Sequence, residues 1–594
     1  MNKNWAAYAA TCAMVVALTG CGGGGGSTPE TKPAQEDLLR PYREQVLNWT
    51  TCDSTILGRA LSEDEVAFAD RLQCAYLRAP MDYNMPSRGD VSVAMMRLSV
   101  RDPAKKRGTL FVNPGGPGVD GLGNALRLAT TYTTLSDPSS DMGALQLRLL
   151  AEYDVVGFSP RGTGASTRLV CGTNELQRHD DATPEGRTPQ VIENMLYNAR
   201  KDAEACKKNP LTPYINSDTT ARDLDLMRGL VGDEKLNYLG YSWGTWLGAW
   251  YAASFPERAG RMVLDSNMNF TNNDEDGDFR KRYTMSFQRL WDEVYAPYAA
   301  RHPNYFNLGS SPEAVRTTFK AIHPKVRNAI TAQLVKNMYG VHDEVDGALG
   351  YVTMAHGLST AMAATPSGDL AAVQQALQSI SFAPNNAQRD ANLRKAAVEL
   401  AAKVMTPDAP SSTSLPWGSA VLNAVKCNDT PAIADPDYWV ALGNEYAQKY
   451  PLMGSLITES TCAFWGGPSV TRPPVAALAP LDILMVQSQF DGPTAAEGAL
   501  EAFESLPKGH MVYVSGEASH GVFPYLRRCV DAPVIRYLLG ESPAERTTVC
   551  EAKPLPLDAR ASVATRSVQA SGFKDAKAAE ARISQFKRGA GVVP

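Results

Sequence analysis

The feature that most restricts the fold of this chain is a series of short apolar segments that end at Gly, Pro, Asn or Asp. Seven of them are rich in β-branched and aliphatic residues: VSVAMMRLSV, GTLFVNPGGPG, YDVVGFSPRG, LNYLGYS, RMVLDS, DILMVQSQFD and MVYVSGEASHG. Because segments of helical length separate them, we predict an α/β fold with a mostly parallel sheet covered by helices on both faces. Ligand sites of such sheets lie at the carboxyl ends of the strands.

The strand pattern stops between RMVLDS and DILMVQSQFD for roughly two hundred residues, a long interval for a connection within one domain. Amphipathic segments such as DFRKRYTMSFQRLWDEVYAPYAA and AQRDANLRKAAVELAAKVM predict a mainly helical cap here. We therefore expect a first core part at 46–270, the cap at 271–475, a second core part at 476–552 and a peripheral tail at 553–594.

Residues 1–20 have the pattern of an export signal, because Lys3 precedes an apolar run, AAYAATCAMVVAL, that is short for a permanent membrane helix. The LTGC that follows at 18–21 resembles the lipobox of bacterial lipoproteins, in which the cysteine is lipidated and becomes the first mature residue. We expect lipidation of Cys21, with an ordinary signal peptide and an incidental cysteine as the alternative. Residues 21–45 are rich in Gly, Ser and Pro and predict a flexible tether.

Cysteine usage agrees with export. Of the ten cysteines, Cys12 and Cys21 lie in the N-terminal segment, which leaves eight, an even number, for disulfides in an oxidising compartment. Because these eight fall along the chain as neighbours, we expect sequential pairing. The predicted pairs are Cys52 with Cys74, Cys171 with Cys206, Cys427 with Cys462, and Cys529 with Cys550.

A membrane is the expected partner apart from the substrate. Gly22 stands where an Asp would resemble an inner-membrane retention signal, which favours the outer membrane in a cell with two membranes. The net charge of -5 offers no electrostatic case for nucleic acid. The chain has no CxxC and no Cys/His cluster with zinc-ligand spacing, so we expect neither a metal nor another cofactor.

The candidate nucleophile is Ser242, in Gly240-Tyr241-Ser242-Trp243-Gly244, which fits G-x-S-x-G between a predicted strand and a helix-like stretch. A strand that turns abruptly into a helix strains the backbone at the serine. Side chains two residues to either side would collide, so both flanks need glycine. The pentapeptide alone is weak evidence, but its strand and helix context makes it informative.

A serine hydroxyl is a poor nucleophile at neutral pH and needs a base that a third group orients. Four of the seven histidines lie in the insertion, away from the predicted strand ends. His510 precedes the last apolar strand, at its amino end, whereas His520 follows that strand in EASHG. We therefore take His520 as the candidate base.

The candidate acid is Asp491, which ends the strand DILMVQSQFD one strand earlier. With it, the order along the chain is nucleophile, acid, base, as expected for α/β-hydrolases. An Asp before Gly-Pro can also be only a turn residue. Asp265, at the end of RMVLD, ranks second, and Asp482 and Glu517 are further alternatives.

Acyl transfer also needs donors for an oxyanion, preferably backbone N–H groups that are already oriented. The glycine-rich turn NPGGPG, Asn113 to Gly118, follows an apolar strand and lets the backbone approach a substrate closely. The N–H groups of Gly116 and Trp243 are the expected pair, with a tight turn of no catalytic role as the alternative.

These residues together resemble the secreted tripeptidyl aminopeptidases and prolyl aminopeptidases of the α/β-hydrolase fold. NPGGPG is similar to their H-G-G-P-G turn with Asn-Pro in place of His, YDVVGFSPRGTGAS to Y-D-V-V-G-x-D-P-R-G-x-G-x-S, and GYSWG to their elbow. CAFWGGP and LRRCVDAPVIRYLLGESP resemble the C-terminal region of the tripeptidyl enzymes. The likeness runs from about Trp49 to Cys550 and implies the catalytic roles already assigned. Ser159 departs from it, because the family usually has Asp there.

The sequence therefore predicts an exported, lipid-anchored serine hydrolase that removes short N-terminal units from peptides. Such an enzyme must bind a free α-ammonium group, for which carboxylates of the cap are candidates, although an acidic run is more often a solvated loop. A carboxylesterase and a surface lipoprotein without catalysis are the alternatives. The candidate carboxylates are Asp274, Glu275, Asp276 and Asp278.

Overall fold

The computed structural model describes residues 37–181, 183–272, 275–339, 344–365, 368–406, 415–454, 460–559, 574–575 and 578, without the side chains of 275–277. The predicted export signal, Cys21, Asp274, most of the tether and most of the tail lie outside the described residues. No described helix is both long enough and apolar enough to cross a membrane.

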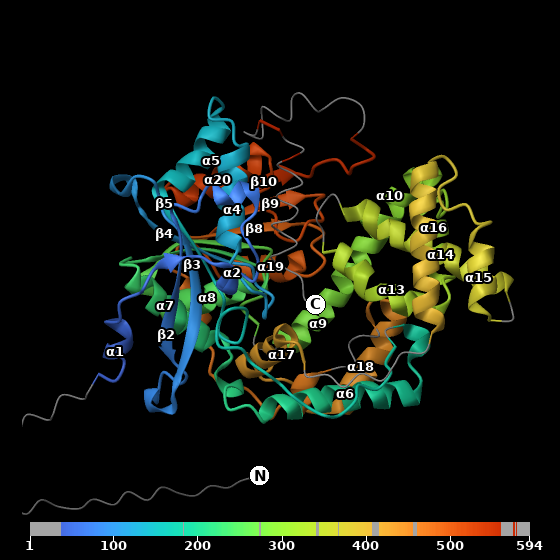
Figure 1. The fold of residues 1–594 in the computed structure, drawn as a ribbon, viewed down its shortest axis with the longest axis horizontal. Coiled ribbons are helices and arrows are strands. Elements are labelled where there is room, and N and C mark those ends of the chain that lie inside the picture. Colours follow the sequence, from blue (N-terminus) through green and yellow to red (C-terminus); the bar gives the residue numbers. More distant parts are fainter. Residues whose placement is uncertain are drawn as a thin grey trace, which may run out of the picture.

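A ten-stranded sheet lies at the centre of the fold, with the strand order β1-β2-β3-β5-β4-β6-β7-β8-β9-β10 (Figure 1). Strands β4 to β10 are parallel, whereas β1, β2 and β3 pair antiparallel at one end. The predicted α/β fold is confirmed, because each of the seven apolar segments contains a strand, β3 to β9. The strands are β1 (Thr50–Thr51), β2 (Leu72–Pro80), β3 (Asp90–Leu98), β4 (Gly108–Asn113), β5 (Tyr153–Phe158), β6 (Leu236–Tyr241), β7 (Ala259–Asp265), β8 (Ile483–Ser488), β9 (His510–Ser515) and β10 (Thr547–Glu551).

Helices cover both faces of the sheet, as expected from its nearly continuous apolar strands. Because strand side chains alternate between faces, Phe111 of β4 joins one apolar core, and its neighbours Leu110 and Val112 join the other. On the Phe111 face lie α7 (Ser217–Leu230), α8 (Trp243–Ser254) and α19 (Ala496–Glu504), and on the opposite face lie α4 (Asn124–Leu135), α5 (Asp141–Glu152) and α20 (Arg528–Leu538). Shorter helices precede them: α1 (Arg40–Arg43), α2 (Ser54–Leu57) and α3 (Glu63–Val66).

The register of the parallel strands brings the predicted site segments to one edge. Asn113 of β4 pairs with Gly240 of β6, Tyr241 pairs with Asp265 of β7, and Asp265 pairs with Val486 of β8. The residues that follow these strand ends therefore meet at the carboxyl edge of the sheet.

The cap is mainly helical in its described part and has an apolar core of its own, in which Trp291, Leu349 and Val352 are buried. It stands beside the sheet in Figure 1. Its elements are α9 (Glu275–Leu290), a π-helical turn (Trp291–Tyr295), α10 (Ala296–Arg301), α11 (Pro303–Phe306), α12 (Pro312–Lys320), α13 (Pro324–Asn337), α14 (Val345–Ala364), α15 (Leu370–Leu377), α16 (Ala387–Met405), α17 (Trp417–Asp429) and α18 (Pro436–Lys449).

One long helix before β6, α6 (Pro189–Lys207), also lies along the cap, below α17 and α18 in Figure 1. Arg187, just before α6, donates to Asn444 Oδ1 of α18 at 2.9 Å. The segment between β5 and α7 thus extends the cap, although it precedes the main insertion in sequence.

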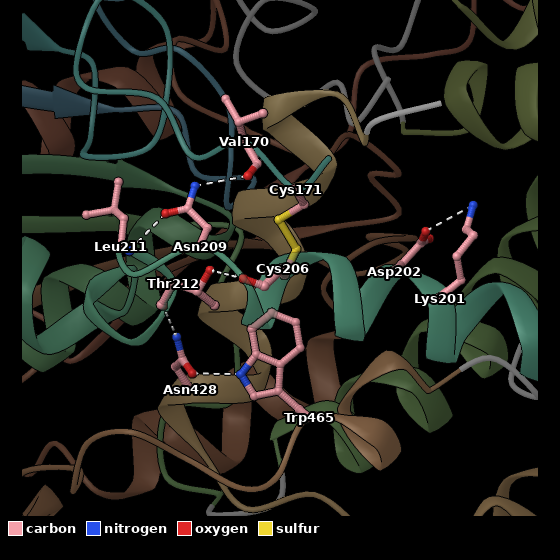
Figure 2. The surroundings of a disulfide bond; sticks show 10 residues. All are labelled: Val170, Cys171, Lys201, Asp202, Cys206, Asn209, Leu211, Thr212, Asn428 and Trp465. Carbon is pink, nitrogen blue, oxygen red and sulfur yellow. Dashed lines mark hydrogen bonds and ion pairs between the residues drawn. A yellow bond between two sulfur atoms is a disulfide. The ribbon is translucent and has the colours of Figure 1, made fainter. Parts of the chain in front are cut away.

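The four disulfides join the predicted neighbours: Cys52–Cys74, Cys171–Cys206, Cys427–Cys462 and Cys529–Cys550. Figure 2 shows the surroundings of Cys171–Cys206, where Thr212 donates a 2.6 Å hydrogen bond to the carbonyl of Cys206. Asn428, next to Cys427, donates to the carbonyl of Thr212 at 2.7 Å. Hydrogen bonds therefore connect the two disulfides that hold α6 and α17, so this part of the cap is fixed to the core.

Candidate active site

Ser242 forms the whole connection between β6 and α8. Its φ of 55° and ψ of -124° are rare for a residue other than glycine, and a backbone of this kind is strained. Its N–H donates to the carbonyl of Asp265 at 3.0 Å, and its own carbonyl accepts from the N–H and hydroxyl of Thr245. Neighbouring backbone thus holds the strained turn at the carboxyl edge of the sheet.

The glycines on either side of the turn are required by close contacts. A Cβ on Gly240 would lie 2.5 Å from the carbonyl oxygen of Gly244, and one on Gly244 would lie 2.8 Å from Asn113 Oδ1. A Cβ on Gly115 would lie 2.8 Å from the nitrogen of Trp243. The glycine-rich turn after β4 therefore packs directly on the turn that holds Ser242.

Asp491 and His520 contact each other on the loops after β8 and β9. His520 Nδ1 lies 3.0 Å from Asp491 Oδ1 and 3.1 Å from Oδ2, and Asp491 is completely buried. Thr494 N–H donates to Asp491 Oδ1 at 2.7 Å, which fixes the carboxylate. The opposite ring nitrogen, His520 Nε2, is buried and has no hydrogen-bond partner among the described residues. It is therefore available for a further group.

The three rival carboxylates make other contacts. Asp265 accepts from the N–H groups of Val522 and Phe523 at 2.8 and 2.6 Å, and so holds the backbone that follows the histidine. Glu517 accepts from the N–H groups of the two residues after it. Asp482 pairs with Arg261 at the amino end of β8. The sequence places Asp265 at a strand end as the second choice of acid and gives no sign of this backbone contact.

The turn after β4 has a backbone that only glycine adopts readily. Gly115, Gly116 and Gly118 have φ values of 90°, 108° and 95°, a region that favours glycine. Asn113 Oδ1 accepts from the N–H of Gly115 at 2.9 Å. Within the described residues, neither Gly116 N–H nor the N–H of Trp243, the first residue of α8, donates to another group. Both donors are therefore free to bind a substrate oxygen.

The cap contacts the histidine directly through Tyr339, a contact without any signal in the sequence. The carbonyl of Tyr339 accepts from the N–H of His520 at 3.1 Å. The two rings meet edge to face, with centroids 5.7 Å apart and an angle of 87° between their planes. The hydroxyls of Tyr339 and Tyr283 of α9 lie 3.2 Å apart, and Ser286 of α9 donates to the carbonyl of Gly492. Cap and core thus form one wall around the acid and the base.

The acidic run at the start of α9 is only partly described. Asp278 accepts two hydrogen bonds from Arg282 Nε, at 2.8 and 2.9 Å, and Arg282 also pairs with Glu501. The side chains of Glu275 and Asp276 lie outside the described residues. Asp278 is thus already paired with an arginine, which it shares with Glu501.

The described residues include the kinds of group on which acyl transfer depends: a serine in a strained turn, a buried carboxylate–imidazole pair, and two backbone N–H groups that donate to no other described group. No group of three or more metal-binding side chains gathers in the described part of the chain.

Comparison with known proteins adds two family matches and several relatives. Residues 108–306 match the family described as α/β hydrolase fold, and residues 450–550 match the family described as TAP-like protein. The first match includes the serine turn and part of the cap. The second includes Asp491, His520, strands β8 and β9, and most of β10.

The relatives span most of the chain at modest identity. A tripeptidyl aminopeptidase of Streptomyces coelicolor is 27% identical over 82% of this chain and 84% of its own length. The serine protease Hip1 of Mycobacterium tuberculosis is 27% identical over 90% of this chain and 95% of its own length. A protein of Mycobacterium tuberculosis named carboxylesterase B is 27% identical over 83% and 87% of the two chains.

Proposed function

The chain belongs to the α/β-hydrolase family with a TAP-like C-terminal region and is a hydrolase, and we propose that it is an exported serine peptidase that releases short units from the N-termini of peptides. In this proposal, Ser242 attacks the scissile carbonyl and forms an acyl-enzyme. His520 Nε2 takes the serine proton and returns it to the leaving amine, and Asp491 holds the imidazole in the required tautomer. The N–H groups of Gly116 and Trp243 bind the oxyanion.

The observation that carries the proposal is the state of His520. Its Nδ1 is held by Asp491, whereas its buried Nε2 has no partner among the described residues. A buried nitrogen without a hydrogen-bond partner lowers the stability of the folded protein. Such an atom therefore calls for an explanation, and a function that needs the free nitrogen is one. A general base that must reach a serine and a leaving group requires this arrangement.

A peptide substrate is favoured over an ester because the relatives over most of the chain include a tripeptidyl aminopeptidase and a serine protease. Recognition of the substrate amine is assigned to the acidic start of α9, with Asp274, Glu275 and Asp276 as the candidates. Asp278 is paired with Arg282. It would bind the substrate ammonium only if that ammonium replaced Arg282 as its partner.

The proposal is tested by assaying the purified full-length protein on tripeptidyl and aminoacyl arylamides, on the same arylamides with a blocked amine, and on short-chain aryl esters. We expect cleavage of the free-amine arylamides and a loss of activity when the amine is blocked. If the protein cleaved the esters but none of the arylamides, whether their amine is free or blocked, the peptidase proposal would be wrong and an esterase would be favoured.

A carboxylesterase is the second candidate, because one relative of similar coverage carries that name. Both activities use the same acyl chemistry, so the arylamide and ester series above decides between them. A lipoprotein without catalysis is the third candidate, and covalent labelling by a fluorophosphonate would eliminate it.

We propose that lipidated Cys21 anchors the protein to a membrane and that the residues between Cys21 and α1 form the tether. The four disulfides are consistent with an oxidising compartment. Metabolic labelling with a fatty acid should mark the natural chain and not the Cys21→Ser variant. Equal labelling of both would show that the anchor is elsewhere.

A further inference from the structure

A cavity of about 310 Å³ lies outside the candidate active site, between α1, α7 and the turn that precedes β7. Gly229 at the end of α7 and Arg258 before β7 line it, which places it toward the amino edge of the parallel strands. Ser242 lies at the carboxyl edge. Figure 1 shows α1 and α7 at the end of the molecule opposite to the cap. The cavity is therefore a separate site.

The walls of the cavity combine apolar side chains with an excess of guanidinium groups. Its apolar lining includes Leu39, Tyr42, Leu226, Leu230 and Phe255. Four arginines and a single carboxylate also line it: Arg43, Arg222, Arg228, Arg258 and Asp225. Such a lining suits a ligand that has both an anionic group and an apolar part.

Arg43 pairs with Asp37, and Arg222 pairs with Asp218. With Asp225, three carboxylates thus serve the four guanidinium groups of the lining, and one positive charge is in excess. Asp225 accepts from Arg228 Nε at 2.9 Å and also pairs with Arg258, so one carboxylate serves two guanidinium groups. Arg228 is bound to the carbonyls of Asp233 and Glu234 as well, and its role is structural. Arg258 is 49% exposed and can take a second anionic partner.

Arg222 is the second arginine suited to an external anion. Its Nε donates to Asp218 at 2.7 Å, but Asp218 is not part of the cavity wall, and the Arg222 side chain is 39% exposed. A guanidinium presents several donors in a plane and can bind a phosphate while it keeps one protein partner. Arg222 and Arg258 thus form a candidate phosphate clamp above an apolar floor.

We propose that this cavity binds the phosphate of an anionic phospholipid head group, with Arg222 and Arg258 on the phosphate and the first carbons of the lipid against the apolar wall. The choice of a lipid, and not free phosphate, as the ligand rests on the proposed function, because that proposal includes the lipid anchor. The rest of the inference does not depend on it. The tether would reach the folded part at α1, which itself borders the cavity. The clamp would then orient the body of the protein on the membrane that the anchor enters.

The test uses the full-length protein in neutral detergent and titration calorimetry with dihexanoylphosphatidylglycerol below its micellar concentration. We expect saturable binding, at least about tenfold weaker binding of dihexanoylphosphatidylcholine, and none of inorganic phosphate at the same concentrations. Equal binding of the two lipids would overturn the anionic selectivity. Phosphate binding as tight as that of the lipid would make the cavity a site for free phosphate, and no binding of any probe would overturn the proposal.

Two variants and a control locate the binding. The double variant Arg222→Gln/Arg258→Gln should bind the anionic lipid at least about tenfold more weakly than the natural protein. Gly229→Leu should do the same without removing an ion pair, because a Cβ on Gly229 meets nothing within 4 Å and a side chain there would occupy the cavity. Arg148→Gln is the matched control, since Arg148 forms an i,i+4 pair with Glu152 and is 41% exposed. Unchanged lipid binding in both variants would contradict the assignment.

Arylamide cleavage in detergent separates this inference from the proposed function. All three variants should cleave as the natural protein does, because none of the substituted residues belongs to the candidate active site. Lipid binding by a protein that cleaves no peptide would support the cavity assignment and would overturn only the proposed peptidase activity.

Discussion

The buried hydroxyl of Ser159 donates a 2.7 Å hydrogen bond to Asp120 Oδ1, two residues after the glycine-rich turn that follows β4. The same carboxylate oxygen accepts from the N–H of Leu122 at 3.0 Å. Gly164 packs so closely on Asp120 that a Cβ there would meet the carboxylate oxygens. The family pattern that the sequence resembles has Asp at the position of Ser159, and in this chain the carboxylate of the contact belongs to Asp120.

The contact predicts that Ser159→Asp alone is harmful, although it restores the residue typical of the family. Two carboxylates would then face each other in a partly buried position, which favours protonation of one of them. We expect the free energy of unfolding to fall by about 2 kcal/mol, measured by thermal or denaturant unfolding.

The exchange variant, Ser159→Asp with Asp120→Ser, is the control. It keeps one carboxylate and one hydroxyl in the contact and should recover most of the lost stability. A double variant as unstable as Ser159→Asp would show that the contact does not explain the departure from the family pattern.

Much of this fold follows from local sequence patterns, because short apolar segments that end at Gly or Asp are sufficient to indicate strands and their carboxyl ends. The contact between Asp491 and His520 lies within the reach of such reasoning, since each residue directly follows a recognisable strand. The position of Tyr339 does not, because it depends on how the cap packs on the core. The anchoring role of Asp265 was also hidden, since an acid beside a histidine loop suggests catalysis before it suggests a backbone contact.

Replacing Ser242 with alanine should abolish turnover, by about a millionfold if it is the nucleophile. Fluorophosphonate labelling should disappear in the same variant. Ser266→Ala is the matched control, because Ser266 is another serine with a positive φ, 60°, and directly follows the neighbouring strand, β7. It should still be labelled to completion. Labelling that persists in Ser242→Ala would assign the nucleophile elsewhere.

The acid is distinguished by comparing Asp491→Asn with Asp265→Asn. Asp491→Asn should lower kcat by about 10⁴-fold with little loss of stability, because an amide at this position favours the wrong tautomer of His520. Asp265→Asn should lower the free energy of unfolding by about 1 to 3 kcal/mol, since an amide nitrogen would face the N–H of Val522 or Phe523. Steady-state kinetics and unfolding of both variants are the measurements. The reverse pattern would make Asp265 the acid.

Tyr339→Ala should slow the reaction even for a small aryl ester that does not need the cap for binding. The variant keeps the backbone hydrogen bond to His520 but loses the edge-to-face ring contact. Such contacts contribute about 0.5 to 1.5 kcal/mol, so kcat should fall by about 2- to 10-fold if the ring positions the imidazole. The pH profile of kcat/KM should shift at the same time.

Tyr339→Phe provides the control for this positioning role. It keeps the ring against His520 and removes only the hydroxyl contact with Tyr283, so its kcat and pH profile should match those of the natural protein. An alanine variant with an unchanged pH profile would limit Tyr339 to a structural role in the cap.

Asp429, at the end of α17, should make the fold less stable as the pH rises. Burial raises its pKa to about 7, despite hydrogen bonds from the N–H of Ser217 at 2.8 Å and from Trp246 Nε1 at 3.0 Å that favour the ionised form. Below about pH 4 the carboxyl is protonated in both states, so it contributes no pH dependence. Between about pH 4 and pH 7 the unfolded chain loses this proton while the folded chain keeps it, so stability falls as the pH rises, by up to about 1.4 kcal/mol per unit. Above pH 7 both states are ionised and the effect levels off.

The measurement is denaturant unfolding of the natural protein and of Asp429→Asn from pH 4 to pH 8. The variant should be less stable at every pH, because its amide nitrogen would face one of the two N–H donors, but its stability should lack this fall with pH. The difference between the two proteins should therefore be largest near pH 4 and smallest at pH 8. Parallel curves would mean that Asp429 is ionised in the folded protein, with Arg472 as its countercharge.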